Sequence, residues 1–209
     1  MVTGAGRGIG RGIALRLSRD GHSVAVNDRD AHGATAVAEE IRAAGGTAVA
    51  YPADVTDPDA VTAMVGQVAE EPGGVDVMID RRTGGKIVSA ASIAGHQGFD
   101  LLGHYSATKF AVRALPQAAA KELAPHRITV NAYRPGIVGT DMWDLIDEQM
   151  GARSGAGRGE TLKQYAAGIP LGRVQTADDV AAFVSDLAGP DSDYMTGQAV
   201  MIDGGVVMV

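Results

Sequence analysis

The chain of 209 residues contains no cysteine, few aromatic residues and no cluster of basic residues. Without cysteine, disulfide bonds, thiolate catalysis and cysteine-based metal sites are excluded. The five histidines do not have the spacing of metal ligands, so we expect no metal site. Acidic residues outnumber basic ones by 25 to 18, and the net charge of -7 disfavours nucleic acid and anionic membranes as partners.

The sequence also lacks a long apolar run. No stretch reaches the roughly 20 apolar residues that a membrane span needs, and the first residues lack the apolar core of a signal peptide. Together with the absence of cysteine, this favours a cytoplasmic protein. Apolar residues make up 45% of the chain, which is enough for one sizeable core, so we expect a single domain over residues 1–209.

Short β-rich runs alternate with helical stretches, in which apolar residues recur three and four positions apart. Asp57 followed by Pro58 is typical of a helix start, and Thr176 with Asp179 has the pattern of a capping box. The alternation predicts a Rossmann-type α/β fold, in which helices cover both faces of a doubly wound parallel sheet. The predicted strands lie at residues 23–28, 47–54, 75–80, 86–92, 128–136 and 199–205.

A glycine-rich turn occupies the N-terminal segment TGAGRGIGRGIA, with Gly4, Gly8 and Gly10 in the spacing T-G-x-x-x-G-x-G. In such a turn, glycine permits the tight bend, the approach of a pyrophosphate and the close packing of the next helix, whose N–H groups bind phosphate. Asp28 ends the following predicted strand, where a carboxylate accepts hydrogen bonds from the adenosine ribose and repels a 2′-phosphate. The pattern predicts NAD as cofactor, although the neighbouring Arg29 would tolerate a 2′-phosphate.

Tyr105 and Lys109 lie four residues apart in a helix predicted to begin near His104, so they share one helix face. A phenol has an ordinary pKa of about 10, and a neighbouring ammonium group favours its phenolate form. Tyr105 is therefore a candidate general acid/base. Ser92 stands where the predicted strand 86–92 ends, and ligand sites in open α/β sheets lie outside the carboxyl ends of the strands.

Over almost its whole length the sequence resembles the classical short-chain dehydrogenase/reductase family. The resemblance implies that Ser92 polarises the substrate carbonyl, that Tyr105 transfers the proton, and that Lys109 holds the nicotinamide ribose and supports Tyr105. The matching pieces are TGAGRGIG, Asp54-Val55, the set of Ser92, Tyr105 and Lys109, and Arg134-Pro135-Gly136 through Thr140.

The resemblance also implies the cofactor contacts and the assembly. Asp54 would contact the adenine, and the stretch from Pro135 to Thr140 would hold the nicotinamide amide. The segment 199–205 resembles the family's last strand, which usually serves tetramer packing, so we expect a homotetramer. The implied cofactor-binding residues are Gly4, Arg7, Gly8, Ile9, Gly10, Asp28, Asp54, Val55, Tyr105, Lys109, Pro135, Gly136, Val138 and Thr140.

Within the family, the segments HYSATKFAVRAL, RPGIVGTDMW and PDSDYMTGQ are similar to the acetoin (diacetyl) reductases and butanediol dehydrogenases. By this resemblance Ile93, Phe99 and Trp143 line a small apolar chamber whose strong polar groups are Ser92 and Tyr105. Such a chamber suits a four-carbon ketone or secondary alcohol, and a charged keto acid would leave its carboxylate unpaired there. Apolar residues at Ile93 and Phe99 resemble the branch that forms (S)-acetoin.

Two alternatives stay open. A reductase of 3-oxoacyl thioesters shares every motif named above, although its bulky substrate needs an open, polar entrance. A nucleotide-sensing regulatory protein on the same fold belongs to another class, and it need not keep Ser92, Tyr105 and Lys109 together.

The sequence departs from the family pattern between Asp80 and Arg81. Only five residues separate the predicted strands 75–80 and 86–92, whereas adjacent parallel strands need a crossover of roughly a dozen residues or more. Asp80 stands where the family has the first Asn of an N-N-A-G loop, and the helix with the family's catalytic Asn is absent. We therefore expect that a segment of about 40 residues, one helix with its approach loops, is missing at this point.

Overall fold

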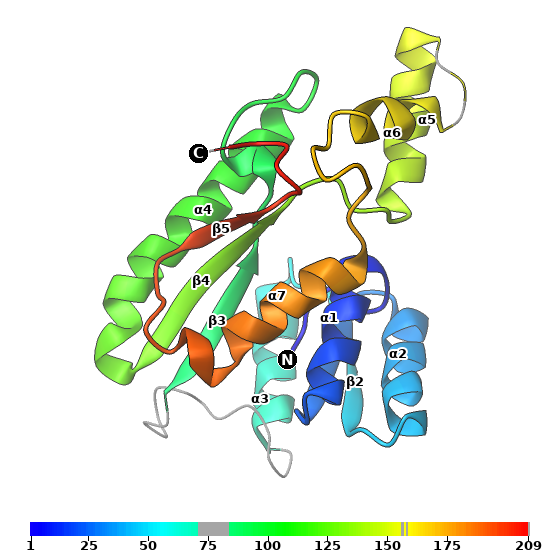
Figure 1. Cartoon of the computed structure of the whole chain (residues 1–209). Helices are drawn as coiled ribbons and strands as arrows, with labels where there is room; N and C mark the ends of the chain where they lie inside the picture. The colour runs from blue at the N-terminus through cyan, green and yellow to red at the C-terminus, as the bar shows by residue number, and fades with distance from the viewer. Residues whose placement is uncertain (71–83, 156, 158, 209) are drawn as a thin grey trace.

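The computed structural model describes residues 1–70, 84–155, 157 and 159–208 (Figure 1). Every strand pairing in this part of the chain is parallel, as predicted. The predicted strand 75–80 and the junction of Asp80 with Arg81 lie outside the described residues. The described strands are β1 (Val24–Asp28), β2 (Ala48–Pro52), β3 (Gly85–Ala90), β4 (Ile128–Pro135) and β5 (Ala199–Ile202).

Helices follow the strands along the chain. A short 3-10 helix, η1, is separated from the end of β3 by two residues, and two further 3-10 turns, η2 and η3, follow α4 and α7. The α-helices are α1 (Gly8–Arg19), α2 (Ala31–Ala43), α3 (Pro58–Glu70), α4 (Gly103–Leu123), α5 (Met142–Ser154), α6 (Glu160–Ala166) and α7 (Ala177–Ala188), and the 3-10 turns are η1 (Ile93–Gly95), η2 (Ala124–His126) and η3 (Pro190–Ser192).

The described strands form two parallel groups. β1 pairs with β2, and β4 lies between β3 and β5. α1 and α7 pack side by side on one face of the strands, where Ile13 of α1 and Val180 of α7 pack with Tyr133 of β4 (Figure 1). Val2, which bridges Val26 of β1, packs against the same core and ties the first group to the second.

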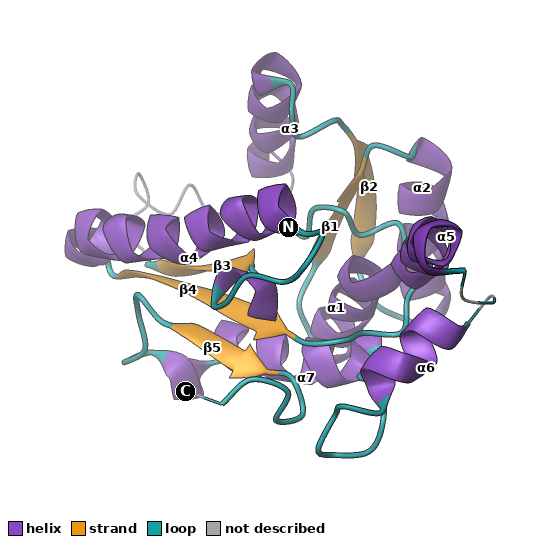
Figure 2. Cartoon of the chain, turned by 90° about the horizontal axis from the view of Figure 1, so that it is seen from above, coloured by secondary structure: helices purple, strands orange, loops and turns teal. Residues whose placement is uncertain are grey.

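Helices cover both faces of each group (Figure 2). In the larger group, Ala120 of α4 packs on Val130 from one side, while Val180 of α7 packs on Tyr133 from the other. In the smaller group, α2 covers one face of β1 and β2, and Met64 of α3 packs against Tyr51 on the other. The doubly wound α/β architecture predicted from the alternation is thus confirmed.

Local signals in the sequence account for the helix starts. A side-chain oxygen of Asp57 accepts hydrogen bonds from the N–H groups of Asp59 (2.9 Å) and Ala60 (3.2 Å), directly before Pro58 opens α3. At α7, Thr176 and Asp179 form the complete reciprocal capping box. Both predicted helix starts are therefore confirmed. No helix among the described residues is long and apolar enough to cross a lipid bilayer.

Candidate active site

The glycine turn lies between Val2 and α1. Gly4 and Gly8 have φ angles of +62° and +55°, in the left-handed region that favours glycine. A Cβ atom on Gly10 would lie 2.1 Å from the carbonyl oxygen of Gly4, so the start of α1 packs directly on the turn. No described side chain caps the helix at Arg7. The first-turn N–H groups of α1 are therefore available to an anion such as a pyrophosphate.

Asp28 ends β1 and is held against the glycine turn. One carboxylate oxygen accepts a hydrogen bond from the N–H of Gly6 at 2.9 Å, and the other accepts one from the N–H of Asp30 at 3.0 Å. Each oxygen keeps a second lone-pair direction, which is what a pair of ribose hydroxyls requires. A Cβ atom on Gly6 would lie 3.0 Å from the Asp28 carboxylate, so a small residue there allows this contact.

Asp54 and Val55 follow β2 and are exposed. Asp54 accepts hydrogen bonds from the Thr56 N–H (2.9 Å) and hydroxyl (2.8 Å). The Thr56 N–H is the largest cause of a lowered Asp54 pKa, with smaller contributions from the Thr56 hydroxyl and the Arg29 charge. Arg29, which follows Asp28, thus lies within electrostatic reach of Asp54.

Ser92 lies just beyond the carboxyl end of β3, as predicted. Its side chain is buried, and its hydroxyl oxygen accepts a hydrogen bond from the N–H of Ala94 at 3.2 Å, which caps η1. η1 then packs on α4 at Gly95, where a Cβ atom would lie only 2.5 Å from the carbonyl oxygen of Lys109. The turn with Ser92 and the helix with Lys109 are thus in direct backbone contact.

Tyr105 and Lys109 are both half-buried in the first two turns of α4, on one helix face as predicted. The Lys109 Nζ atom lies 5.6 Å from the centroid of the Tyr105 ring and donates a hydrogen bond to the carbonyl oxygen of Ala90 at 2.9 Å. Burial lowers the pKa of Lys109. Because Ala90 is the last residue of β3, Lys109 links this pair to the strand end that precedes Ser92.

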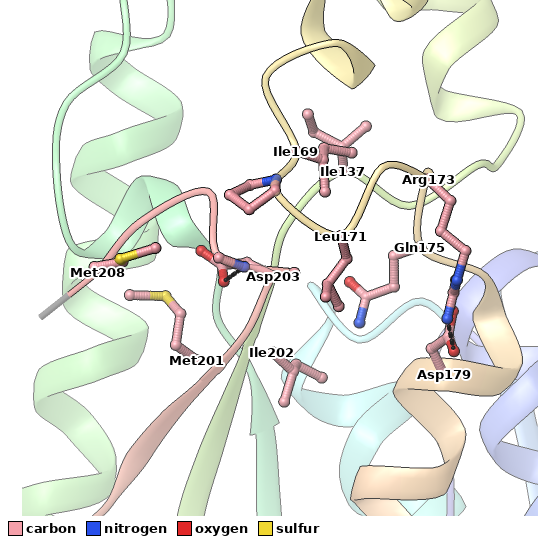
Figure 3. Close-up of a pocket in the computed structure, with 13 residues that line it drawn as sticks. Ile137, Ile169, Leu171, Arg173, Gln175, Asp179, Met201, Ile202, Asp203 and Met208 are labelled. Carbon is pink, nitrogen blue, oxygen red and sulfur yellow. Dashed lines mark hydrogen bonds and ion pairs between the residues drawn. The ribbon is translucent and has the colours of Figure 1, made fainter.

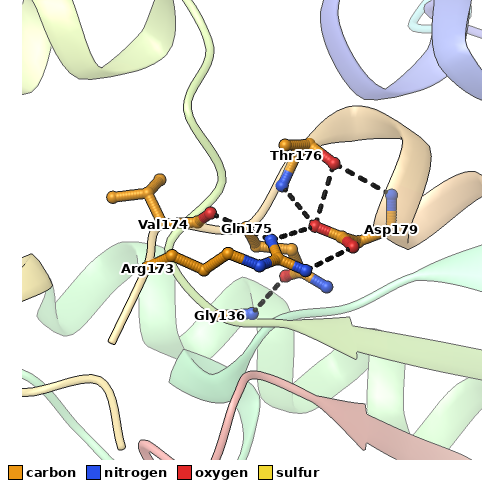
Figure 4. A network of polar contacts seen from close by, with 6 residues as sticks. All are labelled: Gly136, Arg173, Val174, Gln175, Thr176 and Asp179. Carbon is orange, nitrogen blue, oxygen red and sulfur yellow. Dashed lines mark hydrogen bonds and ion pairs between the residues drawn. The ribbon is translucent and has the colours of Figure 1, made fainter. Parts of the chain in front are cut away.

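The stretch from Pro135 to Thr140 follows β4 and is held by Gln175 (Figure 4). The Gln175 side chain accepts a hydrogen bond from the N–H of Gly136 at 3.3 Å, and its backbone pairs with Ile137 and Gly139 at 2.9 Å each. A Cβ atom on Gly8 would lie 3.7 Å from the Thr140 side chain. The structure therefore brings this stretch against the glycine turn, as a shared cofactor site requires.

Further hydrogen bonds hold Gln175 in place. Arg173 forms a bidentate ion pair with Asp179, with N–O distances of 2.6 and 2.7 Å (Figure 4). The same Asp179 carboxylate accepts hydrogen bonds from the N–H and hydroxyl of Thr176. The segment between Arg173 and α7 is thus fixed at both ends, with Gln175 between them.

The residues predicted for the substrate lie on separate elements. Ile93 is buried in η1, and Phe99 is half-buried in the loop before α4. Trp143 lies in α5, with its ring centroid 5.7 Å from that of Tyr165 in α6. Among the described residues, the ring contact of Trp143 is with Tyr165 and not with Ile93 or Phe99, so the shared chamber stays a prediction.

A hollow of about 550 Å³ opens beside this site (Figure 3). Ile137, from the stretch that follows β4, contributes to its wall, but Ser92, Ile93, Phe99 and Trp143 do not. Most of the lining is apolar and comes from the loop before α7 and from the end of the chain. The hollow could not be predicted from the sequence, because its walls come from segments that are far apart along the chain.

Three further residues at the site, Gly6, Gly95 and Gln175, were not predicted from the sequence. Gly95 follows Ser92 by three residues, and its close contact with a helix backbone has no signal in the sequence. Gln175 directly precedes the capping box at Thr176, which the sequence predicted. The contact of Gln175 with Gly136 was not predicted. Gly6 lies inside the glycine-rich segment, and the predicted role of Asp28 was the one signal that its N–H group has a carboxylate partner.

Comparisons with known proteins agree with this geometry. A family model described as short chain dehydrogenase matches residues 1–81, and one described as Enoyl-(Acyl carrier protein) reductase matches residues 80–207. L-2,3-butanediol dehydrogenase of Corynebacterium glutamicum is 40% identical, covering 99% of this chain and 97% of the relative. Diacetyl reductase [(S)-acetoin forming] of Staphylococcus epidermidis is 37% identical, with the same two coverages.

Two further proteins extend the comparison. The 3-oxoacyl-[acyl-carrier-protein] reductase FabG of Staphylococcus aureus is 33% identical, covering all of this chain and 97% of the relative. A crystal structure of a single-residue variant of actinorhodin polyketide ketoreductase with NADPH superposes with a TM-score of 0.93 at 31% identity, covering 98% of this chain and 95% of that one.

The fold and these relatives define the class of protein: a nicotinamide-dependent oxidoreductase built on a Rossmann-type sheet. More particularly, the chain belongs to the short-chain dehydrogenase/reductase family.

Proposed function

We propose that the enzyme interconverts a small ketone and its secondary alcohol with NAD(H), and that diacetyl, acetoin and 2,3-butanediol are its substrates. The observation that carries the proposal is that the turn with Ser92 packs on the α4 backbone at Lys109, and that Lys109 lies on one helix face with Tyr105. Gly95 brings the Ser92 turn onto the α4 backbone at Lys109, and Lys109 reaches back to Ala90. A sensing protein would not need this arrangement, and the family membership also favours an enzyme.

The residues present fit a dinucleotide, since Gly4 and Gly8 have the φ angles that favour glycine, Gly10 has no room for a Cβ atom, and no described side chain caps the first N–H groups of α1. When bound, the nicotinamide supplies or accepts a hydride. In ketone reduction, the Tyr105 hydroxyl donates its proton to the carbonyl oxygen, and the Ser92 hydroxyl donates a hydrogen bond to the same oxygen. The Lys109 ammonium stabilises the phenolate that Tyr105 becomes.

We propose NAD(H) rather than NADP(H) because of the Asp28 carboxylate. It is fixed beside the glycine turn by the N–H groups of Gly6 and Asp30, so a 2′-phosphate would meet a negative charge that cannot move away easily. Arg29 lies near the Asp54 carboxylate, which competes with a phosphate for the guanidinium. The related ketoreductase was crystallised with NADPH, and a 7 alpha-hydroxysteroid dehydrogenase of the same fold was crystallised with NADH. Both cofactors therefore occur among similar folds.

The relatives support the small substrate. Two of them are named for butanediol and diacetyl, at 40% and 37% identity over nearly the whole chain. The proposed chamber of Ile93, Phe99 and Trp143 is apolar, which suits methyl groups at both ends of a four-carbon molecule. From the (S)-acetoin-forming relative and the apolar residues at Ile93 and Phe99, we propose that diacetyl is reduced to (S)-acetoin.

The second candidate is reduction of 3-oxoacyl thioesters, which the 33% identity to FabG favours. An assay with purified enzyme and NADH distinguishes the two candidate functions, with either diacetyl or acetoacetyl-CoA as substrate. The rate is followed as consumption of NADH, and the product of diacetyl reduction is analysed by chiral gas chromatography. We expect diacetyl to be reduced with the higher kcat/KM and to give the (S)-carbinol. An (R)-product would contradict the stereochemical assignment, and no reduction of diacetyl would contradict the substrate class.

We also propose that the natural enzyme is one domain with a further segment between residues 80 and 81. The alignment with the butanediol dehydrogenase runs over 251 positions, 42 more than this chain has residues, and the two family models meet at residues 80–81. Intact mass spectrometry should give a mass above 21.4 kDa. A mass that equals this value would contradict the proposal, and the enzyme would then lack part of its cofactor wall.

The assembly we propose is a homotetramer, as the resemblance of residues 199–205 to the family's last strand implies. Light scattering on purified enzyme should give four times the mass of one chain, and a monomer at micromolar concentration would contradict it.

A further inference from the structure

Arg134 is a buried cation on the α4 side of the sheet. Side chains alternate along a strand, and its neighbour Tyr133 packs into the core shared with α1 and α7. Arg134 therefore points to the opposite face, which α4 covers, and there its partner on β5 is Met201. Only 7% of Arg134 is exposed. Ile13 of α1 packs with Tyr133 on the other face, and Arg134 is not one of the residues proposed to hold the cofactor.

The Arg134 guanidinium makes one side-chain hydrogen bond among the described residues. Its Nη1 atom lies 3.2 Å from Nδ1 of His96, four residues beyond Ser92. A guanidinium only donates, so His96 Nδ1 is the acceptor of this hydrogen bond. The Nε atom of Arg134 is buried and has no partner in the described part of the chain.

The charges around Arg134 do not balance. Burial lowers the pKa of Arg134, the charge of Arg113 on α4 lowers it further, and Asp203 opposes both effects. Among the described residues Asp203 makes no ion pair with Arg134; its two oxygens accept hydrogen bonds from the N–H groups of Gly205 (3.0 Å) and Val207 (2.7 Å). A buried guanidinium beside a second guanidinium, without a bonded carboxylate, is costly unless an anion joins it.

We propose that Arg134, Arg113 and His96, together the Arg134 cluster, bind one small oxyanion: a carboxylate or a monophosphate group. The planar guanidinium presents parallel N–H donors that match two oxygens of such a group, and the unpartnered Nε is one of these donors. His96 and Arg113 are only half-buried, so the cluster borders the surface. The oxyanion comes either from solution or from a carboxylate of a second copy of the chain.

A binding experiment with inorganic phosphate tests the first source. Thermal unfolding of the NADH-loaded enzyme is followed as phosphate, and separately acetate, is added at constant ionic strength. For an anion from solution, we expect the midpoint to rise with either anion. Arg113→Gln should weaken the apparent affinity about tenfold, the ratio that corresponds to roughly 1.4 kcal/mol. Arg134→Met should abolish the response, and Arg19→Gln, at an exposed arginine that ends α1, should leave it unchanged.

Sedimentation tests the second source. If a second copy supplies the carboxylate, phosphate does not change the thermal midpoint. Arg134→Met and Arg113→Gln then raise the dissociation constant of the subunits at least tenfold, and Arg19→Gln leaves it unchanged. The milder Arg113→Gln keeps the test valid if Arg134→Met fails to fold. The proposal is overturned if wild type and Arg113→Gln respond alike to phosphate and dissociate at the same concentration.

Discussion

The ammonium group of Lys109 lies 5.6 Å from the centroid of the Tyr105 ring, one helical turn away on the same face of α4. The pair lies as the proposed proton transfer by Tyr105 requires, with a cation beside the ring of the proposed acid. The hydrogen bond from Lys109 to the carbonyl oxygen of Ala90 keeps the ammonium group in place.

Tyr105→Phe should therefore abolish turnover while leaving NADH binding nearly intact. The change removes the transferred proton and little contact area, and loss of a general acid costs about 10²- to 10⁴-fold in kcat. Steady-state rates with diacetyl and NADH binding by fluorescence give the two measurements. Tyr194→Phe makes the same change at a fully exposed tyrosine and should leave both unaltered. A Tyr105→Phe variant with wild-type kcat would remove Tyr105 from the mechanism.

Asp28→Ser should narrow the preference for NAD(H) over NADP(H). Hydrogen bonds to a charged group are worth about 1.5–3 kcal/mol, so the ratio of the two kcat/KM values should fall by about 10- to 100-fold. Without the carboxylate, Arg29 is free to pair with a 2′-phosphate. The control is Asp30→Ser, which removes the neighbouring carboxylate that caps α2 and should keep the preference. Equal kcat/KM values in the unmutated enzyme would show that Asp28 does not select the cofactor.

The described strands and the starts of α3 and α7 were predictable because their signals are local. The run 23–28 became β1 at Val24–Asp28, and the capping box at Thr176 formed as its spacing required. The contact of Gln175 with Gly136 was not predictable, since it joins residues 39 positions apart and glutamine carries no specific signal. Trp143 packs against Tyr165, and nothing in a single tryptophan tells such a contact from a substrate contact.

Asp179→Asn should destabilise the protein at neutral pH and have less effect in acid. The Arg173 side chain, then the N–H and hydroxyl of Thr176, hold the pKa of Asp179 far below its ordinary value. The folded protein thus binds this proton less readily than the unfolded chain. Asp179 stabilises the fold fully above the ordinary pKa of about 4, and this contribution declines as the pH falls below it.

Urea unfolding of Asp179→Asn and wild type at pH 7 and pH 3 measures this effect. Loss of a helix cap costs about 1 kcal/mol, so we expect a difference of that size at pH 7 and a smaller one at pH 3. Asp178→Asn changes an exposed carboxylate in the same helical turn and should show only a small difference at either pH. An Asp179→Asn difference that does not depend on pH would contradict the assignment.

Gly95 has no functional group, yet it sets the distance between the Ser92 turn and α4. An added Cβ atom would lie 2.5 Å from the carbonyl oxygen of Lys109 and 2.8 Å from its carbonyl carbon. These are backbone atoms, which cannot rotate away as a side chain does, so η1 and α4 must separate. Such overpacking costs about 1–3 kcal/mol of stability.

Gly95→Ala should therefore lower kcat for diacetyl more than it changes the affinity for NADH, because Ser92 and Tyr105 move apart while the glycine turn, on another element, is untouched. A displacement of about 1 Å near reacting groups costs on the order of 10²-fold in rate. Gly98→Ala is the matched control, since a Cβ atom there meets nothing within 4 Å, and it should leave both quantities at wild-type values. If Gly95→Ala lowers only the thermal midpoint and keeps kcat, the close contact serves packing alone and does not align Ser92 with Tyr105.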